Sequence, residues 1–184
     1  MTLTIPTMLT LFRIFLIPVM VLVFYLPFHW SNFAAALVFA LGAVTDWLDG
    51  WIARRYGMYS AFGAFLDPVA DKLAVTVALF LIVQRHPTLL MAMLAAVIVG
   101  REITISALRE WMAGIGEHAR VRVAAMGKLK TIVQMVALIA LLYAEPWLGI
   151  PVFALGEVLL AVAAALTLWS GVAYLRASWP AMRG

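Results

Sequence analysis

The chain alternates long apolar runs with short polar breaks, and this pattern predicts its helices. The apolar runs cover residues 9–28, 33–53, 62–84, 88–112, 123–143 and 151–176. Each is roughly 20 residues long, which is the length that an α-helix needs to cross the hydrocarbon core of a bilayer. Glycine, proline and polar residues fill the breaks, as is typical of short turns between antiparallel helices. The pattern therefore predicts an all-α integral membrane protein with six transmembrane helices.

The composition agrees with this membrane assignment. Hydrophobic residues make up 66% of the 184 residues and charged residues only 12%, whereas soluble domains carry about 25% charged residues. The apolar runs follow one another without a linker or a repeat, so we expect a single transmembrane domain over residues 1–184. Membrane lipids are its expected surroundings. Nucleic acid is excluded as a partner, because the basic residues do not lie along polar elements that could enter a groove.

Lysine and arginine are distributed unequally between the two sides of the predicted bundle. One side comprises both ends of the chain and the turns near residues 54–60 and 113–122, and it holds or adjoins nearly all of the 13 basic residues, beginning with Arg13. The opposite turns hold only Arg85. Cytoplasmic loops carry the excess of basic residues in membrane proteins. We therefore expect both termini to be cytoplasmic.

The aspartates are the most unusual feature of this apolar chain. There are four, and all lie within or beside the second and third apolar runs, at Asp46, Asp49, Asp67 and Asp71. A charged side chain at the bilayer centre costs roughly 2.5–3.5 kcal/mol on insertion scales, so four need compensation on the order of 10 kcal/mol. Spacings of three and four residues place each pair on one helix face. Two adjacent antiparallel helices would thus direct four carboxylates into one pocket on the cytoplasmic side.

A divalent cation is the compensation that this cluster predicts. Hard carboxylate oxygens select Mg²⁺ or Mn²⁺ and leave coordination positions open for water or phosphate oxygens. With four carboxylates, two ions about 4 Å apart can be held, an arrangement that clamps a phosphoryl group during displacement. The cluster therefore predicts a metal-dependent reaction at a phosphate.

The residues between the aspartates fit a phosphate-containing ligand. Gly50, Ala53 and Gly63 are small and permit a ligand or another helix to approach closely. Arg54 offers a planar set of donors, and Ser60 offers a hydroxyl in the turn. Helix packing is an alternative role for the small residues, and a topology signal is an alternative role for the arginine.

Basic residues at the cytoplasmic ends of the fourth and fifth apolar runs could bind an anionic second substrate. These are Arg101, Arg109, Lys128 and Lys130. The alternative is that they are positive-inside charges whose partners are Glu102 and Glu110.

The pattern Asp-x2-Asp-Gly-x2-Ala-Arg-x8-Gly-x3-Asp-x3-Asp, which begins at Asp46, resembles the signature of the CDP-alcohol phosphotransferase family at every fixed position. Further similar stretches lie at residues 5–13, 45–55, 62–72, 101–110 and 127–131. The resemblance implies a six-helix homodimer in the bacterial inner membrane, with its active site facing the cytosol. It also implies transfer of the phosphatidyl group from CDP-diacylglycerol to sn-glycerol 3-phosphate, giving phosphatidylglycerophosphate and CMP.

The resemblance also implies roles for individual residues. Asp46, Asp49 and Asp67 would hold the Mg²⁺ or Mn²⁺ ions, and Asp71 would be the catalytic base and a further metal ligand. The implied CDP-diacylglycerol contacts are Thr10, Gly50, Arg54, Ser60 and Gly63. The implied acceptor-phosphate ligands are Arg109 and Lys128, with Arg101 and Lys130 beside them. One position departs from the family pattern, because Thr4 stands where similar enzymes commonly have asparagine.

Several alternatives remain open from the sequence. The aspartate pattern does not distinguish glycerol 3-phosphate from inositol phosphate, serine or phosphatidylglycerol as the acceptor. An intramembrane prenyltransferase also uses aspartate pairs and Mg²⁺, but it would need more helices and a different spacing. A cation transporter with aspartates on its pathway would be expected to have broken helices and inverted repeats, and the sequence pattern indicates neither.

Overall fold

The computed structural model describes residues 4–58, 60–114 and 124–183. Apart from one isolated β-bridge between Trp147 and Ile150, the regular structure in these residues is helical. The described helices are α1 (Ile5–Phe24), α2 (Ser31–Tyr56), α3 (Ala61–Arg85), α4 (Leu89–Gly114), α5 (Ala124–Tyr143) and α6 (Val152–Arg183). The prediction of an all-α protein with six helices is therefore confirmed.

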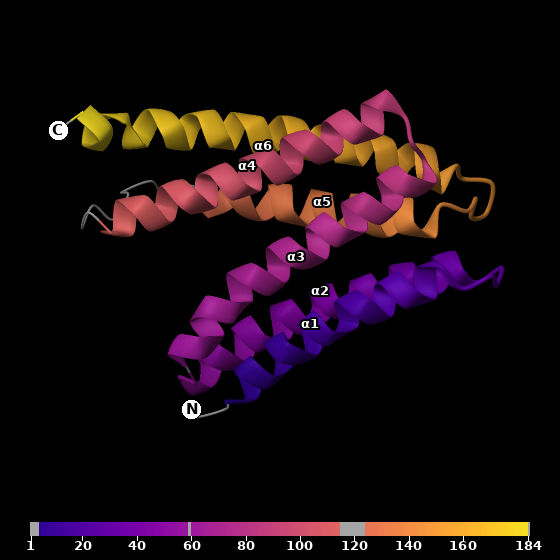
Figure 1. The fold of residues 1–184 in the computed structure, drawn as a ribbon, viewed down its shortest axis with the longest axis horizontal. Coiled ribbons are helices and arrows are strands. Elements are labelled where there is room, and N and C mark those ends of the chain that lie inside the picture. The colour runs from indigo at the N-terminus through magenta and orange to yellow at the C-terminus, as the bar shows by residue number, and fades with distance from the viewer. Residues whose placement is uncertain (1–3, 59, 115–123, 184) are drawn as a thin grey trace.

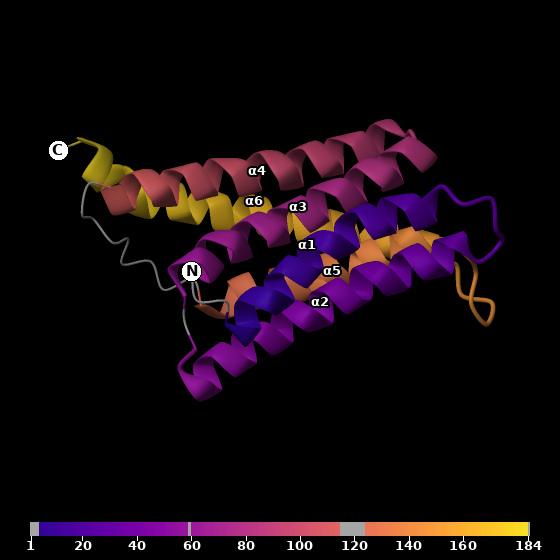
Figure 2. The same cartoon turned by 60° about the horizontal axis from the view of Figure 1, so that its bottom comes forward.

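The helices form one elongated bundle (Figure 1). The helices α1 and α2 make a long hairpin, α5 and α6 make a second one, and these two pairs have the most extensive contacts in the fold. Helix α3 runs between them and contacts α1, α2, α4 and α5, while α4 lies along α6 (Figure 2). The start of α1, the end of α6 and the turn between α2 and α3 lie at one end of the bundle (Figure 1), which is hereafter the terminal end.

The first helix lies four residues earlier than its apolar run indicates. The run covers residues 9–28, but α1 begins at Ile5 and ends at Phe24. Thr4 caps its N-terminus, accepting a hydrogen bond from the Thr7 backbone N–H at 3.5 Å, and a proline stands in its first turn. The helix stops early because Pro27 disfavours helical backbone at the residue before it. Thr4 thus caps α1, a role that an asparagine could also fill.

The turn between α2 and α3 has two local signals that fix its geometry. Gly57 ends α2 in the left-handed region, with φ of 64°. Ser60 then caps α3, and its hydroxyl accepts a hydrogen bond from the Gly63 backbone N–H at 2.9 Å. This short connection makes the C-terminal part of α2 and the N-terminal part of α3, which carry the aspartates, neighbours in space.

The apolar core fills the half of the bundle away from the termini. Its largest fully buried side chains include Met20, Leu79, Ile82, Met91 and Leu138. Many large apolar side chains are instead exposed on the outside of the bundle, as bilayer contact requires; examples are Phe15, Trp47, Phe80 and Leu89. This distribution supports the membrane assignment.

Four of the described helices are long and apolar enough to cross a membrane, namely α1, α2, α4 and the part of α6 up to Arg176. Helix α3 has sufficient length, but it carries Asp67, Asp71 and Lys72. In α5 the described apolar stretch, Leu129–Tyr143, is shorter. Both of these helices contact at least two others in the bundle, so their polar positions can be shielded from lipid by protein. The cytoplasmic location of the terminal end remains a prediction.

Candidate active site

The four aspartates lie in the terminal half of the bundle, on facing parts of α2 and α3 beside the start of α1. The exposed fraction of Asp49 is only 4%, whereas Asp67 is exposed and Asp46 and Asp71 are partly buried. Asp49 experiences the charges of Asp46 and Asp67, and Asp71 experiences that of Asp46. Carboxylates of the two helices therefore lie within electrostatic reach of one another, but they line different cavities, Asp46 and Asp71 one and Asp67 another.

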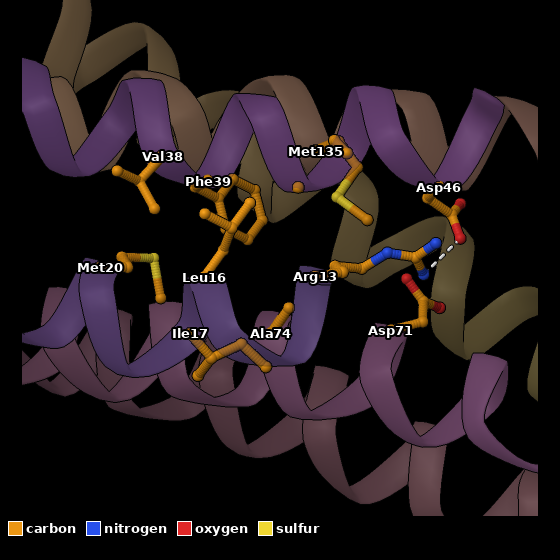
Figure 3. Close-up of a pocket in the computed structure, with 12 residues that line it drawn as sticks. Arg13, Leu16, Ile17, Met20, Val38, Phe39, Asp46, Asp71, Ala74 and Met135 are labelled. Atoms are coloured by element: carbon orange, nitrogen blue, oxygen red, sulfur yellow. Dashed lines mark ion pairs between the residues drawn. The ribbon is translucent and has the colours of Figure 1, made fainter. Parts of the chain in front are cut away.

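An arginine from a third helix neutralises part of this charge. Arg13, on α1, is 3% exposed and places Nη1 2.5 Å from Asp46 Oδ1 and Nη2 2.5 Å from Asp49 Oδ2. Figure 3 shows its guanidinium extending between Asp46 and Asp71. Buried ion pairs of this kind are costly to break, because removal of one partner leaves an uncompensated charge. Sequence reasoning missed this role and treated Arg13 as a topology charge.

A threonine one turn earlier on α1 connects two of the aspartates. The Thr10 hydroxyl lies 2.6 Å from Asp67 Oδ1 and 3.5 Å from Asp49 Oδ2, and 3.1 Å from the Pro6 carbonyl oxygen. Thr10 is itself fully buried. The signal that could have revealed both residues is their spacing: Thr10 and Arg13 are polar residues on one face of an otherwise apolar helix.

As the side chains stand, no three described carboxylate or imidazole groups lie close enough together to hold a metal ion. The Arg13 guanidinium takes the place of a cation between Asp46 and Asp49. Its Nε atom is buried and lacks a hydrogen-bond partner among the described residues, so the carboxylates satisfy the guanidinium incompletely. The donor set of four carboxylates plus a hydroxyl matches the hard-oxygen preference of Mg²⁺ and Mn²⁺. These residues therefore fit the predicted metal site.

Four of the residues predicted to contact CDP-diacylglycerol line one cavity of about 210 Å³ beside Asp67. These are Gly50, Arg54, Ser60 and Gly63. The fifth, Thr10, lies one turn along α1 from Thr7, which also lines the cavity. The structure thus brings together, next to a carboxylate, residues that are more than ten positions apart in the sequence.

The two glycines of this cavity have different packing roles. A Cβ atom on Gly63 would lie 2.9 Å from both the Ser60 and Thr7 hydroxyl oxygens, which are themselves 2.7 Å apart. A Cβ atom on Gly50 would lie 3.2 Å from Arg54 Nη1. Gly63 therefore permits the close approach of α1 to α3, and Gly50 permits the Arg54 side chain to fold back along α2. Packing and cavity lining are combined at both positions.

Of the four basic residues predicted for the acceptor, the three whose side chains the structure describes do not converge on a single point. Arg101 and Lys130 both reach Glu102, with Nη1 and Nζ at 3.5 Å and 2.5 Å from its Oε1, and Arg101 also donates to Ser170 Oγ at 2.8 Å. Arg109 instead lies 5.5 Å from the centre of the Tyr174 ring and lines an open groove of about 640 Å³ between α3 and α4. The side chain of Lys128 lies outside the described residues.

Glu102 is a second site residue that sequence reasoning assigned only a supporting role. Besides pairing with Lys130, it lines a small cavity that Asp71 also lines, between α3, α4 and α5. Asp71 lies within electrostatic reach of both Glu102 and Lys130. The candidate base therefore faces the aspartate cluster on one side and this ion pair on the other.

Comparison with known proteins agrees with this geometry. The chain matches the CDP-alcohol phosphatidyltransferase family over residues 3–169. It is 52% identical over 180 residues to a CDP-diacylglycerol–glycerol-3-phosphate 3-phosphatidyltransferase of Pseudomonas fluorescens, covering 97% of this chain and 92% of that protein. It is 53% identical over 178 residues to proteins of the same name from Escherichia coli strain K12 and Shigella flexneri serotype 5b, covering 97% of this chain and 96% of each. The chain therefore belongs to the CDP-alcohol phosphatidyltransferase family.

Proposed function

We propose that this protein transfers the phosphatidyl group from CDP-diacylglycerol to sn-glycerol 3-phosphate, forming phosphatidylglycerophosphate and releasing CMP. The observation that carries the proposal is the position of Asp67 in the lining of the cavity that Gly50, Arg54, Ser60 and Gly63 also line, with Thr10 linking Asp67 to Asp49. The names of the relatives, which are more than half identical to this chain over nearly its full length, support glycerol 3-phosphate as the acceptor.

The metal ions in this proposal are Mg²⁺ or Mn²⁺, two in number, held by Asp46, Asp49 and Asp67 with Asp71 as a further ligand. When bound, they neutralise charge on the diphosphate and stabilise the leaving group. Arg13 would release Asp46 and Asp49 to make room for them. The pairing of Arg13 with Asp46 and Asp49 supports this proposal, because these two carboxylates already share one positive charge.

The CDP group of the lipid substrate binds in the cavity next to Asp67. The Arg54 guanidinium is exposed and lines this cavity, so it can donate to phosphate oxygens of the CDP group without a large desolvation cost. The Ser60 and Thr7 hydroxyls lie on the opposite, α1–α3 side of the cavity. These contacts orient the diphosphate and stabilise CMP as it leaves.

Asp71 acts as the base. It takes the proton from the acceptor hydroxyl, whose oxygen attacks the phosphorus that carries diacylglycerol, and the bond from that phosphorus to CMP breaks. Glu102 and Lys130 line, together with Asp71, a cavity that Asp46 does not line. Their mutual pairing holds this wall of the site in place.

The basic residues indicate the side of the membrane on which the reaction takes place, and the family resemblance indicates the oligomeric state. Arg54 and Arg55 at the C-terminal end of α2 lie at the terminal end of the bundle, where basic residues favour the cytoplasmic side. We therefore place the active site at the cytosolic face of the bacterial inner membrane. The protein acts as a homodimer, in keeping with the family resemblance.

CMP release from CDP-diacylglycerol by the purified protein tests this function. Release is expected with glycerol 3-phosphate and Mg²⁺ or Mn²⁺, and it should cease with EDTA. Serine, inositol phosphate and phosphatidylglycerol are the matched acceptor controls. Greater release with any of these would overturn the acceptor assignment, and no release with any acceptor, as expected for a cation transporter, would overturn the transferase assignment.

A further inference from the structure

A small polar cavity lies behind Asp71, between α3, α4 and α5. Besides Asp71, its polar lining residues are Lys72, Glu102, Lys130, Thr131 and Gln134. The volume is about 30 Å³, and a single water molecule needs about 10–15 Å³ of such space. The cavity therefore has room for a water molecule or for one hydroxyl-bearing carbon of a ligand.

Gln134 is the residue in this lining whose hydrogen bonding is incomplete. It lies on α5, is 5% exposed, and its Oε1 atom is buried without a hydrogen-bond partner among the described residues. A buried carbonyl oxygen that stays unpaired destabilises a folded protein. A hydroxyl donor from a bound molecule would satisfy it.

The formal charges around the cavity balance one another, which suits a neutral group. Asp71 and Glu102 contribute carboxylates, and Lys72 and Lys130 contribute ammonium groups. Lys130 is already paired with Glu102 at 2.5 Å, so it offers little unbalanced positive charge to an anion. A phosphate group would meet the carboxylates of Asp71 and Glu102, whereas a hydroxyl would meet the unpaired oxygen of Gln134.

We propose that Gln134 recognises the non-reacting hydroxyl of the acceptor alcohol, which enters this cavity while the neighbouring hydroxyl faces Asp71. The inference rests on the proposed function and deepens it by naming a specificity-determining residue. The acceptor's phosphate then lies outside the cavity. Two hydroxyls on adjacent carbons suit this arrangement, because Asp71 and Gln134 line the same small space.

The wild-type protein provides the first test. Its kcat/KM is measured with glycerol 3-phosphate and with 3-hydroxypropyl phosphate, which keeps the reacting hydroxyl and the phosphate but lacks the middle hydroxyl. A preference of about 10- to 100-fold for glycerol 3-phosphate is expected, because the analogue leaves the Gln134 oxygen unpaired. Equal use of both acceptors would overturn the inference, while the proposed function would stand. Absence of transfer to glycerol 3-phosphate would instead overturn the proposed function.

The second test uses Gln134→Met, which keeps the size of the side chain and removes the acceptor oxygen. The preference for glycerol 3-phosphate is expected to fall to within about threefold, with the KM for CDP-diacylglycerol unchanged. The matched control is Gln84→Met. Gln84 lies near the C-terminal end of α3, away from Asp71, and accepts a hydrogen bond from Tyr25. The control should keep the wild-type preference. A preference that survives in Gln134→Met would overturn the inference.

Discussion

The two halves of this bundle are stabilised by different interactions, although the same six helices build both. Away from the termini the interior consists almost entirely of apolar side chains, such as Met20, Leu79, Met91 and Leu138. In the terminal half the buried side chains include Thr10, Arg13, Asp49, Lys130, Gln134 and Ser170. Helices α1, α5 and α6 therefore change from apolar to hydroxyl, amide or basic burial along their lengths, and α2 changes to a buried carboxylate.

This difference separates stability from function along the bundle axis. Close-packed apolar side chains contribute independently, so a substitution there costs stability in proportion to the volume lost. Buried charges depend on their partners, so a substitution in the terminal half leaves another group uncompensated. Substitutions in the apolar half should therefore change stability alone, whereas substitutions in the terminal half should also change substrate or metal binding.

The largest effect is expected for the candidate base. Asp71→Asn removes the proton acceptor while keeping the size of the side chain, so turnover should fall by at least about a thousandfold. The binding of CDP-diacylglycerol should be largely retained, and equilibrium binding of the lipid substrate checks this. Turnover within tenfold of wild type would show that Asp71 is not the base.

The second largest effect is expected when the buried cation is removed. Arg13→Met leaves Asp49 buried beside two other carboxylates, and we expect a loss of about 3–5 kcal/mol in the free energy of unfolding in EDTA. Added Mn²⁺ should recover part of that loss, because the metal replaces the guanidinium as the compensating charge. Thermal unfolding in detergent with EDTA and with Mn²⁺ measures both quantities.

Leu79→Ala is the matched variant in the apolar half. It should cost about 2–5 kcal/mol through loss of buried volume. Because Leu79 touches no charged group of the site, Mn²⁺ should stabilise this variant by the same amount as wild type. If Mn²⁺ stabilises Arg13→Met no more than Leu79→Ala, the guanidinium and the metal do not compete for the same carboxylates.

A smaller effect is expected at the predicted ligands of the acceptor's phosphate. Arg109→Ala and Lys128→Ala should each raise the KM for glycerol 3-phosphate about 10- to 100-fold, since a hydrogen bond to a charged group contributes about 1.5–3 kcal/mol. The KM for CDP-diacylglycerol should change little. Steady-state kinetics with each substrate varied in turn provide the measurement. If both KM values stay within a factor of two, these residues serve as topology charges.

The smallest effect, and the most direct comparison of the two halves, comes from a pair of glycines. A Cβ atom on Gly63 would meet the Ser60 and Thr7 hydroxyls at 2.9 Å, and one on Gly156 would meet Leu141 at 2.9 Å. Each Gly→Ala variant should lose about 1–3 kcal/mol by overpacking. The KM for CDP-diacylglycerol should rise only in Gly63→Ala, because Gly63 lines the nucleotide cavity. An equal rise in both variants would contradict the separation of the two halves.

Much of the site could be predicted because its residues are close in sequence. The spacings of Asp46 with Asp49 and of Asp67 with Asp71 fix each pair on one helix face, and the short turn after Gly57 brings the two helices together. The neighbouring cavity residues lie on the same two helices, so local spacing also placed them. Their roles toward metal and substrate remain predictions.

The remaining features depend on contacts between segments that are distant in sequence. The spacing of Arg13 from Thr10 places it on a polar face of α1, but only the packing of α1 against α2 places it between carboxylates. The pairing of Lys130 with Glu102 likewise depends on the approach of α4 and α5.

The sequence by itself determined that the chain is a helical membrane protein and that its carboxylates lie on facing helices, because hydrophobic period and residue spacing act within one or two turns. It also predicted the chemistry, since four carboxylates in apolar sequence require a cation. Only the tertiary structure decided that the Arg13 guanidinium is the cation that the protein itself places beside Asp49. It also decided that the Gln134 side-chain oxygen is buried without a partner among the described residues. Both depend on where separate helices meet, which no local spacing specifies.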